Sequence, residues 1–307
     1  MGGSGGGFFH DPIDTARKLR DAEQEAQDQK FDSEITSNIG KLLTDINERD
    51  TEAIQRHLKT IRDAIQSDID GFINLRYGGS VAKHTYVDGL SDVDSLALIN
   101  SSELSNKGPE EVKEYFYQRL KQRFPNTEIR KGDLAITLKF SDKEIQILPA
   151  LKRGNSYKIA SLTGRDKWTM INPNRFALSL RATNQKMSGK LVPMIKLAKS
   201  IISNLPSSRQ LSGYHTEALA IECFSRYSGD KNTKAMLKHF FQTATKHVLN
   251  PLQDKTGQST HVDDYLGSKN SINRKMVSDS LAQVGRKMQN ADAARSKRSW
   301  QEILGVN

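Results

Sequence analysis

The chain has 307 residues, of which 36% are hydrophobic and 27% are charged, and its formal net charge at pH 7 is +10. This length is enough for one large domain or two modest ones, and the composition excludes a purely disordered, collagen-like or coiled-coil chain. No apolar run reaches the roughly 20 residues that cross a bilayer, and the first residues lack the pattern of a secretory signal. The single cysteine, Cys223, excludes an internal disulfide and a cysteine-cluster zinc site, so we expect a cytoplasmic protein.

The positive charge is concentrated in the later part of the chain. Residues 1–76 carry a net charge of −5, so the remaining residues carry +15. The segment 165–200 has eight Lys and Arg residues against one Asp, and 269–299 has eight against two acidic residues. Such one-sided charge favours a phosphate-rich ligand, either nucleotides or a nucleic-acid strand. A solvated basic face without a partner explains the charge equally well.

The first 73 residues predict helices after a flexible start. Residues 1–9 are rich in glycine, and we expect them to form a flexible tail. Charged residues with spaced Ile and Leu predict helices over about 13–30 and 33–73. The second of these carries one apolar stripe, because its aliphatic residues recur at intervals of three and four: Ile54, Leu58, Ile61, Ile65 and Ile69.

Strand and helix patterns alternate in the next segment. Residues 93–99 predict a short buried strand, and helical spacing returns over 109–124. Alternating apolar residues then flank the polar turn 141–143, which predicts a β-hairpin over 134–148.

Beyond about residue 175 the sequence predicts no strand. Helical patterns cover 175–203, 213–227, 232–249 and 271–292. The chain therefore divides into three predicted parts: a tail with a lead-in helix (1–30), an α/β core (31–168) and a helical domain (169–307). Near the C-terminus, Trp300 is expected to dock the last residues onto the core.

The segment 77–99 carries the residues that point to chemistry. It contains Gly-Gly-Ser and, after eleven residues, Asp-Val-Asp at the start of an apolar strand. Gly79 and the glycine before it allow the backbone to approach an anion, and Ser80 with nearby amides donates to phosphate oxygens. Asp92 and Asp94 alternate along a strand, so both carboxylates point to one face. This arrangement suits two Mg²⁺ ions that hold an attacking hydroxyl and a nucleoside triphosphate in line.

This combination of a helix, a Gly-Ser turn and Asp-x-Asp at a strand start resembles the DNA polymerase β-like nucleotidyltransferase superfamily. Gly79-Ser80-x-x-Lys83-x-Thr85 together with Ser91-Asp92-Val93-Asp94 is similar to the bacterial cGAS/DncV-like nucleotidyltransferases (CD-NTases). The resemblance covers roughly residues 50–305. It implies an α+β fold, in which a polymerase β-like nucleotidyltransferase core, a small mixed sheet with helices, is followed by an all-helical domain.

Two residues depart from the pattern of this family. His84 stands where the family more often has Gly. Ile147-Leu148-Pro149-Ala150 resembles the end of the family's third-acid strand, but the position of the third acid, three residues before the proline, is Gln146. Glu144 lies two residues earlier, on the same face of the predicted strand. Three alternatives stay open: Glu144 substitutes for the acid, a two-carboxylate site works with Gln146, or the enzyme is inactive.

The resemblance extends to the helical part. Lys199 and the segment 213–219 are similar to the family's helix Lys and Ser-Tyr/Phe turn, which contact the triphosphate and the base. Tyr214 is the aromatic candidate for stacking on a base, and Lys186, Lys190, Lys196 and Lys199 are spaced to form a phosphate-facing ridge. His215 and the segment 261–264 are interpreted as structural. The predicted nucleotide-binding residues are thus Gly79, Ser80, Lys83, Lys196, Lys199 and Tyr214; the predicted catalytic residues are Asp92, Asp94, Glu144 and Gln146, of which Asp92 and Asp94 bind metal.

The resemblance implies an enzyme that joins nucleoside or deoxynucleoside triphosphates, without a template, into a cyclic or linear oligonucleotide and releases pyrophosphate. The implied cofactor is Mg²⁺ or Mn²⁺. In this family the products are signals in bacterial anti-phage defence, so the expected partners are nucleoside triphosphates such as ATP, an oligonucleotide product in a basic cleft, and a separate effector protein. Two other functions remain open: an impaired nucleotidyltransferase fold that binds nucleotides or oligonucleotides, and a transferase that modifies one tRNA, protein or small-molecule acceptor.

Overall fold

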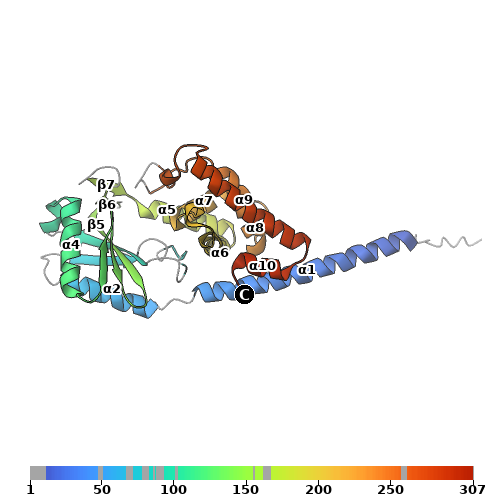
Figure 1. The fold of residues 1–307 in the computed structure, drawn as a ribbon, viewed down its shortest axis with the longest axis horizontal. Helices are drawn as coiled ribbons and strands as arrows, with labels where there is room; N and C mark the ends of the chain where they lie inside the picture. The colour runs from blue at the N-terminus through green and yellow to red at the C-terminus, as the bar shows by residue number, and fades with distance from the viewer. Residues whose placement is uncertain are drawn as a thin grey trace, which may run out of the picture.

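The computed structural model describes residues 12–47, 51–66, 72–77, 83–85, 87, 93–100, 103–154, 156–161, 167–256 and 261–306. For residues 12–13, 51–53, 72–77, 93–94, 100 and 105 it describes the backbone alone. Figure 1 shows a sheet with its helices at one end of the molecule and a group of helices at the other, with the first helix lying along the helical group. None of the helices in the described ranges combines the length and the apolar character that a membrane crossing requires.

Helix α1 (Pro12–Asn47) is continuous, so the predicted break between two helices at residues 31–32 is wrong. No Gly or Pro interrupts the helix there, and Phe31 belongs to its apolar face. Phe31, Ile35 and Ile39 recur every four residues, are buried, and join the core of the helical group. The N-terminal part of α1 is exposed and extends past the other helices in Figure 1.

Helix α2 (Thr51–Gln66) has the predicted apolar stripe. Ile54, Leu58, Ile61 and Ile65 are all buried, whereas Ile69 lies outside the described residues. The predicted helix ends earlier than expected, because Phe72–Tyr77 form strand β1. Its sequence alternates Ile, Leu and Tyr with Asn and Arg, a period-two pattern that the helix prediction overlooked.

The sheet is mixed, with the order β1-β2-β5-β4-β3 and with β6 and β7 continuing from β5. Strands β2 and β5 are parallel, and the other pairs are antiparallel. The strands after β1 are β2 (Val93–Asn100), β3 (Glu128–Lys131), β4 (Ile136–Lys139), β5 (Glu144–Arg153), β6 (Ser156–Ala160) and β7 (Trp168–Ile171). The predicted strand over 93–99 and the predicted hairpin over 134–148 are confirmed.

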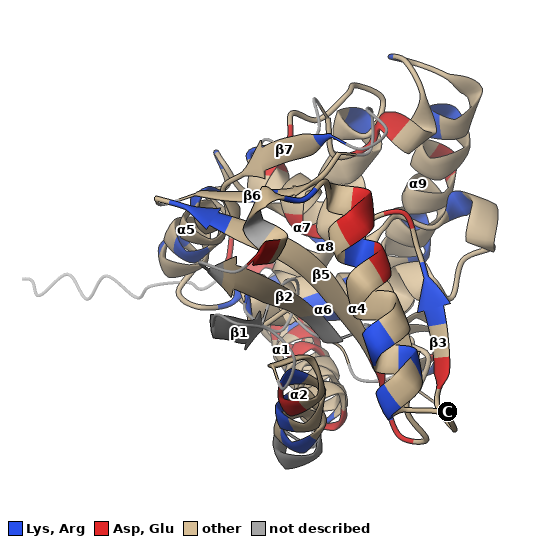
Figure 2. Cartoon of the chain, turned by 90° about the vertical axis from the view of Figure 1, so that its left-hand side faces the viewer, with Lys and Arg blue, Asp and Glu red and all other residues tan. Residues whose placement is uncertain are grey.

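Helices α2 and α4 (Pro109–Arg123) cover one face of the sheet and bury its apolar side chains, among them Ile145 and Ile147 of β5. In Figure 2 strands β2 and β5 lie side by side, and the outer surface of α4 carries charged residues of both signs. The opposite face has a smaller apolar cluster that includes Leu98 and Ala150. Because β5 alternates between these two faces, its polar residues Glu144 and Gln146 lie opposite the main core of the sheet.

The rest of the chain is helical, as predicted. The helices are α5 (Pro173–Lys186), α6 (Leu191–Ser203), α7 (Gly213–Cys223), α8 (Thr233–His247), α9 (Ile272–Ala293) and α10 (Lys297–Leu304), with short 3₁₀ turns at Glu103–Asn106, Ser207–Arg209 and Asp264–Leu266. The predicted helix over 175–203 is broken at Ser188 and Gly189, which both have positive φ. Trp300 is fully buried and donates to Asp292 at 2.9 Å, so it docks α10 as expected.

The predicted α+β fold class, a small mixed sheet with helices followed by helices alone, is therefore confirmed. The limits 1–30, 31–168 and 169–307 for its parts remain a proposal.

Candidate functional site

Four polar residues occupy neighbouring positions across four strands of the sheet. Asp94 of β2 is in register with Gln146 of β5, and Gln146 is in register with Thr137 of β4. Thr137 in turn is in register with Arg130 of β3. Residues in register on paired strands lie on the same face of a sheet, so these positions form one polar row opposite the main apolar core. Asp92, two residues before Asp94, lies outside the described residues.

Glu144 lies on the same strand as Gln146, two residues earlier and on the same face. Its Oε1 is 2.9 Å from Nη2 of Arg130 and 3.9 Å from Nζ of Lys139, and about a third of its side chain is exposed. An ion pair with this exposure contributes little to stability, about 0–1 kcal/mol. The ion pair nevertheless directs the carboxylate of Glu144 toward β3. The residue in register with Asp94 is Gln146.

The residue types at positions 94 and 146 offer the oxygen ligands that a magnesium ion prefers. A carboxylate at Asp94 and the amide oxygen of Gln146 are hard ligands of the type that Mg²⁺ prefers. Within the described ranges no three His, Cys, Asp or Glu side chains gather closely enough to hold a metal. A metal bound beside Gln146 would therefore meet one neutral ligand where a third acid would supply charge.

A second polar cluster joins the segment 83–85 to helices α6 and α7. Lys199 of α6 donates to Oε1 of Glu217 on α7 at 2.7 Å and to the backbone oxygen of Thr85 at 3.0 Å. The ammonium of Lys83 and the hydroxyl of Thr85 also donate to the carboxylate of Glu217. The side chains of Lys83, Lys199 and Glu217 are only 12%, 7% and 1% exposed. Two residues predicted to bind triphosphate therefore share one buried carboxylate.

The carboxylate of Glu217 is held in its charged form. Its burial raises the pKa, but the nearby ammonium groups of Lys83 and Lys199 and their hydrogen bonds outweigh burial, so the pKa lies below its ordinary value. The cluster thus combines two cations and one anion. The backbone of Gly213 lies close to the ammonium of Lys199, because a Cβ at Gly213 would stand 3.4 Å from Nζ of Lys199.

Aromatic rings border this cluster. Nζ of Lys83 lies 4.9 Å from the ring centroid of Phe176 and 5.1 Å from that of Tyr214. The two rings meet edge to face with centroids 4.7 Å apart. The hydroxyl of Tyr214 donates to Asp254 at 2.8 Å, and burial raises the pKa of this phenol, which stays protonated. The predicted base-stacking residue is thus anchored at its hydroxyl and packed against a second aromatic ring.

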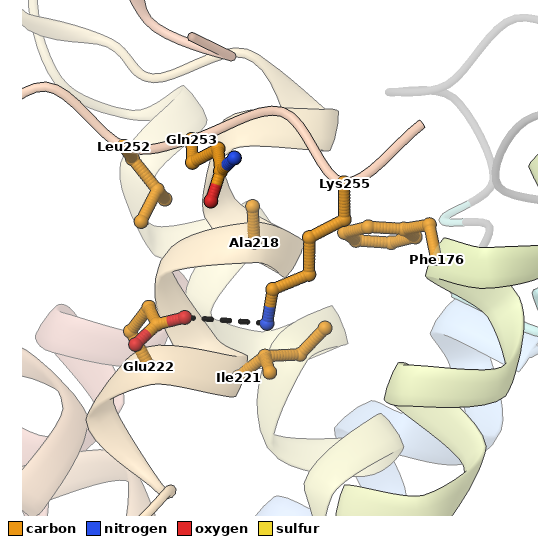
Figure 3. A pocket seen from close by; sticks show the side chains of 7 residues that line it. All are labelled: Phe176, Ala218, Ile221, Glu222, Leu252, Gln253 and Lys255. Atoms are coloured by element: carbon orange, nitrogen blue, oxygen red, sulfur yellow. Dashed lines mark ion pairs between the residues drawn. The ribbon is translucent and has the colours of Figure 1, made fainter. Parts of the chain in front are cut away.

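Phe176 also lines a small pocket. Figure 3 shows its lining, in which Lys255 extends across the opening to Glu222 of α7 with Nζ and Oε1 3.3 Å apart. Ala218 and Ile221 of the same helix form its apolar wall, and Leu252 and Gln253 complete the lining.

The remaining predicted residues have different surroundings. Gly79 and Ser80 lie outside the described residues. Lys196 is buried and donates to Asn47 of α1, whereas Lys186 and Lys190 are exposed, so the four lysines do not form one exposed ridge. His215 and Asp263 are fully buried and belong to a network with Arg274, whose Nη1 is 2.7 Å from Oδ2 of Asp263. The burial of His215 and Asp263 in this network agrees with their structural interpretation.

Sequence reasoning missed Glu217 and Phe176. Glu217 lies three residues after Tyr214, one turn further along the same helix, and this acidic residue directly precedes the apolar run 218–221. An ionisable residue beside such a run is buried only when a partner neutralises it, and this was the available signal. Phe176 carries no such signal, because an aromatic residue at helical spacing is usually a core residue.

Comparison with known proteins gives one family and a set of similar folds. Residues 34–184 match the Second Messenger Oligonucleotide or Dinucleotide Synthetase (SMODS) domain. The structure of CdnC from E. coli MS115-1, solved with ATP, has a TM-score of 0.68 at 15% identity, covering 89% of this chain and 97% of CdnC. For CdnG of Bradyrhizobium diazoefficiens, a CD-NTase solved with GTP, the TM-score is 0.64 at 14% identity, covering 87% and 94%. The di-nucleotide cyclase DncV of Vibrio cholerae gives 0.62 at 10% identity, covering 94% and 89%. No curated protein matches the sequence significantly.

Proposed function

We propose that this chain is a nucleotidyltransferase of the bacterial cGAS/DncV-like type (CD-NTase) that joins nucleoside triphosphates into an oligonucleotide signal without a template. The match of residues 34–184 to the SMODS domain and the similarity in fold to CdnC support this proposal. The observation that carries the proposal is the register of Asp94 with Gln146 on parallel strands. In the sequence, the Asp-Val-Asp motif follows the Gly-Gly-Ser motif after eleven residues. We assign these adjacent positions to the place where a triphosphate and an attacking hydroxyl meet, because a carboxylate and an amide both offer oxygen ligands.

Asp92, Asp94 and Gln146 are the residues that we assign to the metal site. Bound Mg²⁺ or Mn²⁺ would neutralise phosphate charge and lower the pKa of the attacking hydroxyl. Gln146 supplies a neutral oxygen and accepts no proton at neutral pH, so the proton of the hydroxyl has to leave by another group or by water. Glu144, two residues away and paired with Arg130, is the nearest carboxylate on the strand itself.

For the triphosphate we assign Gly79, Ser80, Lys83 and Lys199, and for the base Tyr214. The relatives support a nucleoside triphosphate as substrate, because CdnC was solved with ATP and CdnG with GTP. Lys83 and Lys199 come from the two sides of one cluster, so a phosphate chain beside that cluster would meet cations from both the 83–85 segment and α6. We assign Lys196 to the triphosphate with less support, since its ammonium already donates to Asn47.

We further propose that the product acts in bacterial anti-phage defence, in the cytoplasm, through a separate effector protein. CdnC has also been solved in a complex with a HORMA protein, which supports a protein partner for this fold. The basic excess after residue 76 favours a product longer than a dinucleotide, because additional phosphates require additional counter-charge.

A second candidate function is nucleotide binding without synthesis. It is favoured by one observation, the neutral Gln146 at the position in register with Asp94. In that case the clustered cations hold a nucleotide or an oligonucleotide, and no phosphodiester bond forms.

Mass spectrometry of reaction products separates these functions. The purified chain is incubated with Mg²⁺ or Mn²⁺ and with each NTP and dNTP, singly and in pairs. We expect an oligonucleotide product that is absent from the Asp92→Ala/Asp94→Ala double variant. The mass of the product distinguishes a cyclic from a linear molecule and ribose from deoxyribose. Bound but unconverted nucleotide, in the wild type and in Gln146→Asp, would support the binding function instead.

A further inference from the structure

Glu217 connects two separate parts of the chain through a buried carboxylate. One of its oxygens accepts from Lys199 of α6 and from the hydroxyl of Thr85, and the other accepts from Lys83. The segment 83–85 directly follows the predicted phosphate-binding turn, and α6 belongs to the helical part. Glu217 is therefore the meeting point of the two cations that we assign to the triphosphate.

The charge balance of this cluster depends on Glu217. Lys83 and Lys199 are both nearly buried, and two ammonium groups that contact one carboxylate repel each other strongly when the carboxylate is neutralised. Lys199 is also hydrogen-bonded to the backbone oxygen of Thr85 at 3.0 Å. Loss of the negative charge would therefore displace both ammonium groups and loosen the attachment of the 83–85 segment to α6.

The neighbours of Glu217 distinguish it from a purely structural ion pair. Tyr214 lies one turn earlier on α7, and its ring borders the ammonium of Lys83. Three residues with a predicted nucleotide role thus surround this one carboxylate. Asp292 offers a contrast, because it also accepts from two lysines, Lys234 and Lys238, but has no predicted nucleotide-binding residue beside it.

Building on the proposed function, we propose that Glu217 is a positioning residue for the nucleoside triphosphate. It holds Lys83 and Lys199 in place before the nucleotide arrives, and it acts through them without touching the nucleotide. Preorganised side chains lose less rotamer freedom on binding, so fixing these two long side chains strengthens binding about tenfold.

The test is equilibrium binding of ATP, CTP, GTP and UTP, each measured separately with Mg²⁺ on the full chain. Glu217→Gln keeps the shape of the side chain and removes its charge. We expect it to weaken binding of the preferred nucleotide about tenfold. The matched control is Asp292→Asn, which removes a carboxylate shared by two lysines elsewhere in the helical part. This control is expected to lower the melting temperature and to leave nucleotide binding unchanged. Equal affinity of Glu217→Gln and the wild type would overturn the proposal.

A double-mutant cycle with Lys83→Met shows whether Glu217 acts through the lysines. We expect Glu217→Gln to weaken binding less in the Lys83→Met background than in the wild type, because one of its two cations is already gone. Strictly additive effects would contradict a positioning role. If Glu217→Gln alone does not fold, Lys83→Met is compared with the double variant, whose cluster keeps the net charge of the wild type. The double variant is then expected to bind more weakly than Lys83→Met, and equal binding would overturn the proposal.

Kinetics provide a readout that a purely structural role does not move. In the synthesis reaction, Glu217→Gln is expected to raise KM for the nucleotide while kcat at saturation changes much less. The outcomes also separate this inference from the proposed function. Nucleotide binding without any product contradicts synthesis and leaves the positioning role standing. Product formation with unchanged binding by Glu217→Gln contradicts the positioning role alone, and failure of the wild type to bind any of the four nucleotides contradicts both.

Discussion

His84 has a backbone conformation that favours glycine. The family resemblance implies glycine at this position, and the φ of His84 is +59°, in the left-handed region that glycine adopts without strain. Its side chain is exposed, so packing does not explain the choice of residue. The turn between the Gly-Ser motif and the Glu217 cluster therefore carries a backbone constraint.

Substitution at His84 tests this constraint. His84→Val introduces a β-branched residue at a positive φ and is expected to lower the free energy of unfolding by about 1 kcal/mol. His84→Gly is expected to change it little, because the relief of strain is offset by the greater freedom of glycine in the unfolded chain. Denaturant unfolding of both variants measures the difference. Equal stability of the two variants would show that the backbone at residue 84 is unstrained.

At the residue scale the sequence predicted the motif but not its surroundings. The Asp-x-Asp pattern and the strand that contains Gln146 are local signals, and the register of β2 and β5 brings Asp94 and Gln146 to adjacent positions. The burial of Lys196 and Lys199 was not predictable in the same way. Spacing along α6 places these lysines on a face, but only the packing of α1 and α7 against that face decides what they meet.

At the scale of elements, helix α1 divides into an exposed part and a packed part. Leu19, near its start, is 63% exposed, whereas Ile35 is 1% exposed and packs in the core of the helical group. Ile35→Ala is expected to lower the free energy of unfolding by about 2–5 kcal/mol, because it leaves a cavity in that core. Leu19→Ala on the same helix is the matched control and is expected to change it by less than about 0.5 kcal/mol.

Denaturant unfolding measures both variants of α1. Similar losses for Leu19→Ala and Ile35→Ala would mean that the N-terminal part of the helix is covered in solution, by another molecule or by another part of the chain. A small loss for Ile35→Ala would mean that α1 does not pack on the helical group.

Elements were predictable where their periodicity was long. Helices α4, α8 and α9 follow their predicted ranges closely, and α2 has its stripe. The short strands β3, β6 and β7 were not predicted, because four or five residues carry too little periodicity and owe their form to pairing with neighbouring strands. The break predicted within α1 was wrong for a related reason. The charged residues around Phe31 look like a loop in the sequence, and only the packing of Phe31 in the core of the helical group shows that the helix continues.

At the scale of the whole molecule, the stability of the helical part depends on pH through His215. Burial lowers the pKa of His215 from 6.5 to about 4, and its Nδ1 is 2.9 Å from the hydroxyl of Tyr265. Nε2 of His215 is 3.5 Å from Oδ2 of Asp263, and Arg274 lies beside that carboxylate. Because the unfolded chain binds a proton at this residue more readily than the folded chain, stability is complete above about pH 6.5 and falls as the pH drops toward 4.

The expected loss from this residue between pH 7 and pH 5 is about 2 kcal/mol in the free energy of unfolding. Denaturant unfolding across this range measures it. His215→Gln is expected to reduce the dependence on pH, although the variant is less stable at pH 7. A wild type whose stability is constant from pH 7 to pH 5 would show that His215 titrates normally in the folded protein.

The central claim is that the positions of Asp94 and Gln146 form the transfer site of a nucleotidyltransferase. The most direct measurement is the rate of pyrophosphate release from nucleoside triphosphates with Mg²⁺, compared for the wild type, Asp94→Asn and Gln146→Asp. We predict that the wild type releases pyrophosphate and that Asp94→Asn lowers the rate at least about a hundredfold. At low Mg²⁺ concentration we predict a higher rate for Gln146→Asp than for the wild type, because a carboxylate binds the metal more strongly than an amide. No release by the wild type or by Gln146→Asp, or equal release by Asp94→Asn, would contradict the claim.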